Sequence, residues 1–159
     1  MRREAIRRAL SIMVILTAVS VLPPCRAGAS GPAIGVVRNV SGTASVTRGG
    51  ESIPAAAGTK LLAGDTLVTG PGGSLGAVLR DDSTLSLGPE SSIVVQNFDF
   101  SPREGKFDLL IRITTGTMAY LSGLIGKLAP ETVRFETPVA TIGIRGTRFA
   151  VQVGNPALR

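Results

Sequence analysis

After residue 33 the chain alternates short apolar runs with residues that form turns. The runs are rich in Val, Ile, Leu and Thr, and Gly, Pro, Asp or Ser separate them, as expected for β-strands joined by turns. Leu75, Ala77 and Leu79 are apolar residues at every second position, as in a strand with one face in the core. We therefore predict an all-β domain over residues 34–153, with strands at 35–40, 43–48, 60–62, 66–69, 75–80, 84–87, 93–98, 107–113, 117–121, 133–137 and 147–153.

The centre of the chain has a loose repeat. Leu67, Leu75, Leu85 and Ile93 follow one another at spacings of 8, 10 and 8 residues, with Gly-, Pro-, Asp- and Ser-rich turns between them. Strands of this length and spacing suit a sandwich, a small barrel or a β-solenoid. The pattern predicts a short-stranded β-solenoid-like or sandwich-like domain and does not choose between these arrangements. Residues 122–128 are the exception, and form either one helical turn or a loop.

Residues 136–151 read ETPVATIGIRGTRFAV. Two β-rich segments flank a glycine-containing turn that carries Arg145. In the second segment Phe149, Val151 and Val153 alternate with Ala and Gln, which is typical of a half-buried strand. We interpret this block as the strand pair that closes the domain.

The first 29 residues have the pattern of a signal peptide. A short cationic start, MRREAIRR, precedes an apolar run at 9–22 that is too short for a comfortable membrane span. Two prolines stop the helix, and Ala27-Gly28-Ala29 provides the small residues of a cleavage site. We predict cleavage after Ala29 and a periplasmic or secreted domain that does not span the membrane.

Two other export routes stay open for this segment. Cys25 could be lipidated, although proline occupies the preceding position, where a lipobox has a small residue. Arg7 and Arg8 could belong to a twin-arginine signal, although its usual continuation is missing. We favour ordinary secretion over both.

The charge of the chain is concentrated in this N-terminal segment. The net charge is +6, yet from Ser30 onward there are 12 basic and 10 acidic residues. No basic run with interleaved aromatic residues remains after that point. We therefore predict that the domain does not bind nucleic acid.

The chain contains no histidine, and Cys25 is its one cysteine. This composition excludes histidine general bases, histidine-dependent nucleophiles and the usual zinc, copper and iron sites. Carboxylate chemistry and a cation site of oxygen ligands stay possible, but no pair of acids is marked out for a glycosidase. We predict no enzymatic activity, no cofactor and no metal.

Four sequence blocks occur in order along the exported part. They are G-x-V-x-x-V-x-G-x-A-x-V at 35–46, GDTLVTGPGGSLGAVLRDDSTLSLGPESSIVV at 64–95, TTGTMAYLSG at 114–123 and ETPVATIGIRGTRFAV. Together they resemble the FecR domain of bacterial envelope proteins. One position departs from that family, which usually has glycine where this chain has Asp82.

The resemblance implies an exported all-β domain and does not imply an enzyme. The best-known members of the family are transmembrane transducers that link an outer-membrane receptor to a sigma factor. Their sigma-regulating part precedes the membrane segment, whereas only eight residues precede the apolar run here. The resemblance therefore implies a stand-alone sensor half without the cytoplasmic regulator half.

Four residues are candidates for a structural or interaction role: Asp65, Asp81, Arg145 and Thr147. Asp65 follows Gly64, so it is expected to cap a turn, the alternative being an ion-pairing or binding carboxylate. Arg145 is expected to pair with Asp65 or Asp81, the alternative being an anionic ligand. For Asp81 and its neighbour Asp82 we expect solvated turn residues rather than a cation site.

We therefore predict an exported, non-catalytic FecR-domain protein that serves as a periplasmic interaction or sensing module. Its partner would be an envelope protein or a cell-wall component. The alternative is a structural protein of the envelope that associates with the cell wall or with glycan. One tyrosine and five phenylalanines offer few stacking platforms for sugars, which counts against glycan binding.

Overall fold

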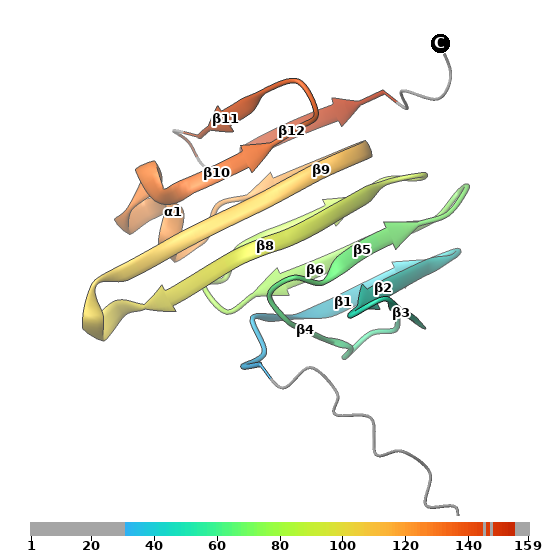
Figure 1. Ribbon diagram of the computed structural model, residues 1–159, viewed down its shortest axis with the longest axis horizontal. Helices are drawn as coiled ribbons and strands as arrows, with labels where there is room; N and C mark the ends of the chain where they lie inside the picture. Colours follow the sequence, from blue (N-terminus) through green and yellow to red (C-terminus); the bar gives the residue numbers. More distant parts are fainter. Residues whose placement is uncertain (1–30, 145, 147, 155–159) are drawn as a thin grey trace, which may run out of the picture.

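The computed structural model describes residues 31–144, 146 and 148–154. Within these residues the chain forms twelve strands, a short α-helix and two 3-10 helices (Figure 1). The elements are β1 (Gly35–Ser41), β2 (Ala44–Arg48), β3 (Glu51–Pro54), β4 (Lys60–Leu61), β5 (Thr66–Thr69), β6 (Ser74–Leu79), β7 (Thr84–Leu87), β8 (Ser92–Ser101), η1 (Pro102–Glu104), β9 (Lys106–Leu121), α1 (Leu124–Leu128), η2 (Pro130–Thr132), β10 (Val133–Glu136), β11 (Thr141–Gly143) and β12 (Arg148–Val153).

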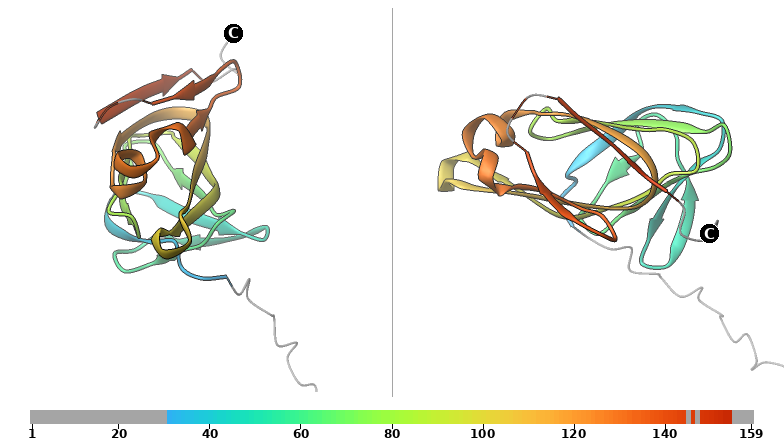
Figure 2. Two further views of the ribbon diagram at one scale, coloured as in Figure 1. Left: turned by 90° about the vertical axis from the view of Figure 1, so that its left-hand side faces the viewer. Right: turned by 90° about the horizontal axis from the view of Figure 1, so that it is seen from above.

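The strands form one curled sheet in the order β3-β2-β5-β8-β9-β7-β6-β1-β4. β10 and β12 also pair with β9, and β11 pairs with β10. All pairs are antiparallel except β9 with β10. Figure 2 shows that the sheet rolls so that its two halves face each other across the core. The prediction of an all-β domain is confirmed, and the antiparallel pairing forms one curled sheet, a half-barrel, rather than stacked parallel rungs.

The long strand β9 joins the two halves of the sheet. Its first part pairs with β8 and β10, and its second part pairs with β7 and β12. Gly116 lies between the two parts with φ +87°, a conformation that favours glycine. A side chain at Gly116 would also collide with Ser91. The two strands expected at 107–113 and 117–121 are therefore one strand, because Gly116 bends it without ending it.

Two further differences concern the end of the chain and a short strand near its start. The last block does contain two strands, but β11 pairs with β10 and β12 pairs with β9, so they are not a pair with each other. β3 was not predicted, because Glu51–Pro54 is polar and ends in proline. The helical alternative for residues 122–128 is confirmed as α1.

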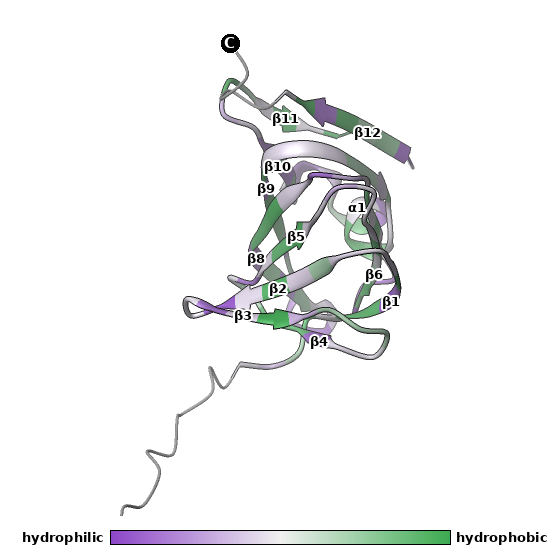
Figure 3. Ribbon diagram, turned by 90° about the vertical axis from the view of Figure 1, so that its right-hand side faces the viewer, coloured by the Kyte–Doolittle hydropathy of each residue, from purple (hydrophilic) through white to green (hydrophobic). Residues whose placement is uncertain are grey.

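The core lies between the two halves of the curled sheet. All four residues of the predicted repeat, Leu67, Leu75, Leu85 and Ile93, are buried there. Tyr120 and Phe135 meet edge-to-face with ring centroids 5.0 Å apart, and together with the aliphatic side chains they close the end of the core beside β10. Full burial of each large apolar side chain contributes roughly 1.5–3 kcal/mol to folding. Exposed and half-buried residues alternate along β12, so one face of the strand covers this end of the core. Figure 3 shows that β12 carries both hydrophobic and hydrophilic residues.

Candidate functional site

Asp65 lies almost fully buried, with 1% of its surface exposed, in the turn before β5. Its carboxylate accepts a hydrogen bond from the backbone N–H of Leu62 at 2.8 Å, as expected for a turn cap. It also forms a two-point ion pair with Arg48, with Nε–Oδ1 2.8 Å and Nη2–Oδ2 2.7 Å. Arg48 in turn donates to the backbone oxygen of Lys60 at 2.8 Å. This contact ties β2 to β4, which lie near opposite ends of the strand order.

The hydrogen bond to Asp65 raises the pKa of Arg48 above its usual value, against the opposing effect of burial. The guanidinium is therefore charged at any physiological pH. Both expected roles of Asp65, turn cap and ion-pairing carboxylate, are realised in the same side chain. Its partner in the described part of the chain is Arg48, which the sequence did not single out.

Asp81 is fully buried in the turn between β6 and β7. Its side chain accepts hydrogen bonds from Ser83 Oγ at 2.6 Å, from Ser83 N–H at 3.2 Å and from Ile125 N–H at 3.3 Å. Its backbone oxygen accepts the N–H of Leu124 at 2.6 Å. The expectation that Asp81 is a solvated turn residue is wrong, because α1 folds over the turn and excludes water from it.

Ser83 connects this turn to the core aromatic residue Tyr120. Ser83 Oγ lies 3.0 Å from Tyr120 Oη and accepts the N–H of Gly123 at 3.0 Å. Because the single hydroxyl proton of Ser83 goes to Asp81, Tyr120 is the donor in the other hydroxyl contact. We call the three linked side chains Asp81, Ser83 and Tyr120 the buried triad. It has no histidine and its hydroxyl and carboxyl groups are all engaged, so it is a structural cluster.

Burial raises the pKa of Tyr120, and the nearby Asp81 raises it further, while hydrogen bonds with Ser83, Ser122 and Gly123 oppose the shift. The neutral phenol is therefore the form that the fold favours. This agrees with the geometry, because only the neutral phenol can donate to Ser83. The exposed neighbour Asp82 takes φ +63°, a left-handed geometry that favours glycine, the residue usual in the family at this position.

A second buried cluster joins the turns at the opposite end of β7. Thr69 Oγ1 donates to the backbone oxygen of Gly88 at 2.6 Å and accepts the N–H of Ser91 at 2.9 Å. Ser91 Oγ accepts the N–H of Thr117 at 2.9 Å and lies against Gly116, at the bend of β9. The polar residues of the two central sequence blocks are thus used to fix turns.

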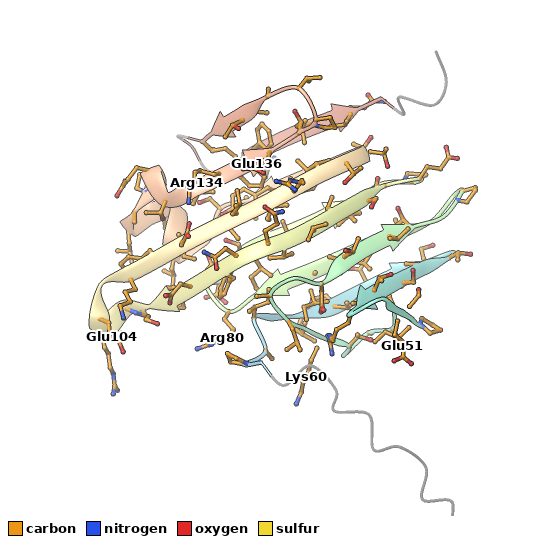
Figure 4. All side chains as sticks on the ribbon, in the orientation of Figure 1. Glu51, Lys60, Arg80, Glu104, Arg134 and Glu136 are labelled. Atoms are coloured by element: carbon orange, nitrogen blue, oxygen red, sulfur yellow. The ribbon has the colours of Figure 1, made fainter. Side chains whose placement is uncertain are left out.

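The outer face of β8, β9 and β10 carries a strip of charged and polar side chains. Arg112 donates to Glu136 Oε2 from Nε at 3.1 Å and from Nη2 at 2.8 Å. Asp108 accepts hydrogen bonds from Arg134 at 3.1 Å and from Asn97 at 2.6 Å. Arg134 and Glu136 project from β10 in Figure 4. We call these five residues the outer strip.

An open hollow of about 390 Å³ lies at one end of the outer strip. Three threonine side chains line it together with the Arg112–Glu136 pair. The exposed fractions of Arg112 and Glu136 are 52% and 28%, so water reaches both groups. The hollow is lined by Arg112, Ile113, Thr114, Glu136, Thr137, Pro138 and Thr141.

The structure brings Asp65 and Asp81 into separate buried clusters. Arg145 and Thr147 lie outside the described residues, so the pairing expected for Arg145 stays a prediction. No sequence signal marks the outer strip, because its acidic and basic residues meet only through the parallel pairing of β9 with β10. The pairing of Arg112 with Glu136 could have been predicted only if the register of β9 and β10 had been known.

Two further observations concern the part of the chain that the structure describes. None of its helices is long and apolar enough to cross a membrane. No three of its acidic side chains gather closely enough to hold a metal ion.

The fold and these contacts define a small all-β domain with structural polar clusters inside and charged side chains on the outer face of its sheet. The chain belongs to the FecR family, because the family model described as FecR protein matches residues 65–159. The resemblance found in the sequence blocks is thereby confirmed. No curated protein and no solved structure matches the chain significantly.

Membership of this family suggests a regulatory or signalling role. FecR proteins are regulatory and signalling proteins, and their FecR domains are periplasmic modules. The matched segment begins at Asp65, but β1 and β2 pair with β6 and β5 within the same sheet. The folded unit therefore includes strands that precede the matched segment.

Proposed function

We propose that this chain is an exported, non-catalytic interaction or sensing module of the bacterial envelope. In this proposal residues 1–29 are a signal peptide cleaved after Ala29, and residues 34–153 form the functional FecR domain. Family membership supports a regulatory role, and the cationic and apolar pattern of the N-terminus supports export. The partner is an envelope protein.

One observation carries the proposal. In the described residues, every buried side-chain nitrogen and oxygen has a hydrogen-bond partner within the protein. A catalytic group must be available to a substrate, whereas Asp65, Asp81 and Ser83 are engaged in holding turns. The polar chemistry left for function is therefore on the surface.

The outer strip is the surface that suits a protein partner best. It offers two guanidinium and two carboxylate groups, all partly exposed, beside a hollow that can receive a partner's side chain. Exposed ion pairs add little to folding, so the strip can exchange its internal pairs for pairs with a partner. Because the strip carries both positive and negative charges at fixed positions on the sheet, it can select a partner whose charges are arranged in the complementary pattern.

Capture from an envelope extract tests the proposal. The full chain carrying a C-terminal tag is compared with the double variant Arg112→Ala, Glu136→Ala. A matched control is Glu104→Ala, Lys106→Ala, which removes an exposed ion pair at the distant tip of the β8–β9 hairpin (Figure 4). We expect one defined envelope protein with the wild type and the control, and its loss with the outer-strip variant at unchanged melting temperature.

Two outcomes would contradict this proposal. Equal capture by all three proteins would exclude the outer strip as the binding surface. Retention on purified peptidoglycan, without enrichment of a membrane or periplasmic protein, would favour the alternative role as a cell-wall-associated structural protein.

A further inference from the structure

The described part of the sheet ends in four edge strands, β3, β4, β11 and β12 (Figure 1). An edge strand has a row of unpaired backbone N–H and C=O groups, so proteins protect such strands against unwanted pairing. β3 contains Glu51 and ends at Pro54, β4 has two residues, and β11 has three and ends in glycine. These three edges are protected by charge, proline or shortness.

β12 is the least protected of the four edge strands, because its one charge, Arg148, lies at its first residue. Its six residues, RFAVQV, contain no proline and no glycine, and they alternate regularly between exposed and half-buried. The strand pairs with β9 from Arg148 to Val153 without a register shift, so its backbone is held extended. The only strand with which it pairs in the described part of the chain is β9. The opposite edge of β12 is therefore a regular template for another strand.

We propose that β12 pairs antiparallel with β12 of a second copy of this chain, across a two-fold axis at Ala150. Residues that face each other in an antiparallel pair lie on the same face of the sheet, so the register must pair even with even and odd with odd positions. With the axis at Ala150, Arg148 lies opposite Gln152 and Phe149 lies opposite Val151. The sheet of one copy then continues into the sheet of the other.

Charge favours a second copy as the occupant. Arg148 is the only charged residue of β12, and in this register it faces the neutral Gln152. The two Arg148 residues are four positions apart along the strand, or about 14 Å at ~3.4 Å per residue. This separation exceeds the Debye length of about 8 Å at physiological ionic strength, so their repulsion is largely screened. The strand is thus complementary to itself.

Packing favours the same register. Phe149, Val151 and Val153 are half-buried and contact the core at the rim of the sheet. In the dimer Phe149 packs beside Val151 of the second copy, and aromatic with β-branched pairs are among the favourable neighbours in sheets. The small side chain of Ala150 lets the two strands approach at the axis. Because the interface is short, we expect a weak dimer, with a dissociation constant on the order of 10 µM.

Cysteine cross-linking tests the register directly. In the full chain carrying Cys25→Ser, the change Ala150→Cys places two thiols on the axis. Residues directly opposite in antiparallel strands have Cα atoms about 4.5–5.5 Å apart, within the range of a disulfide. The matched control is Gln152→Cys, whose two thiols would be about 14 Å apart along the strand. We expect a disulfide-linked dimer with Cys at 150 and at least tenfold slower cross-linking at 152.

Sedimentation equilibrium provides a second measurement on chains without added cysteine. The wild type and Ala150→Ser are expected to dimerise with rising concentration, whereas Ala150→Lys places like charges on the axis and should weaken dimerisation at least tenfold. Monomers at all concentrations would overturn the proposal, because the edge is then covered within one chain or binds another protein. Equal cross-linking at 150 and 152 would overturn the proposed register.

Discussion

The buried triad and the outer strip use the same chemical groups in opposite settings. In the triad, Asp81 is fully buried and is held by a hydroxyl and two backbone N–H groups. In the outer strip, Glu136 accepts both bonds from Arg112, but 28% and 52% of these side chains stay exposed. The distances are similar, so hydrogen-bond geometry does not separate the two clusters.

Access of water separates them. When a buried acceptor is removed, its donors are left without a partner and each costs about 1–3 kcal/mol. When an exposed partner is removed, water replaces it, and the pair is worth about 0.2–1 kcal/mol. The comparison therefore assigns stability to the triad and only a small contribution to stability to the outer strip.

The largest effect is expected for Asp81→Ala. This change leaves Ser83 Oγ, Ser83 N–H and Ile125 N–H without their acceptor in a buried turn. We expect the free energy of unfolding to fall by about 3 kcal/mol, since these donors are inaccessible to water. Denaturation with urea, followed by circular dichroism, measures the change.

The adjacent residue is the matched control for this change. Asp82 is exposed and has φ +63°, so Asp82→Gly removes a carboxylate and relieves the backbone. We expect unchanged stability or a gain of up to about 1 kcal/mol. Equal losses from the two variants would mean that burial of Asp81 is not the cause.

Tyr120→Phe is expected to have a smaller effect with a characteristic pH dependence. At pH 7 it removes the hydrogen bond to Ser83 and should cost about 1 kcal/mol. The pKa of Tyr120 is raised in the folded protein, so above the ordinary value of 10.0 the unfolded chain loses this proton first. The wild type should therefore lose stability as the pH rises above 10.

Tyr120→Phe isolates the contribution of phenol titration to stability, because phenylalanine has no proton to lose. Its stability should fall less steeply than that of the wild type when unfolding is measured between pH 9 and 11. The two proteins would then become closer in stability at alkaline pH. Parallel curves would show that the fold does not favour the neutral phenol.

The apolar pattern predicted many of the strands and core residues, because strand formation depends on residues that are neighbours along the chain. Leu67, Leu75, Leu85 and Ile93 are core residues as their spacing indicated, and the turn-cap role of Asp65 is confirmed. The break expected before residue 117 was wrong because Gly116 reads as a turn residue but bends a continuous strand. Local signals identify strands and turns better than they identify where a strand continues.

The partners of the polar residues could not be predicted in this way. Arg48 meets Asp65 from 17 residues away, and Tyr120 meets Ser83 from 37 residues away. Such contacts depend on which strands become neighbours, and many arrangements are compatible with the same apolar pattern. For the same reason Asp81 looked like an exposed turn residue, since only the position of α1 shows that it is covered.

The smallest effect is expected in the outer strip, where a double-mutant cycle on Arg112 and Glu136 measures the pair itself. Each single alanine variant and the double variant are compared in urea denaturation at low and high salt. Because both side chains are partly exposed, the coupling free energy should be below about 1 kcal/mol and should shrink when salt is added. A coupling as large as the loss from Asp81→Ala would place the strip with the structural clusters. In that event the outer face would hold the fold together, and its pairs would not be free to exchange with those of a partner.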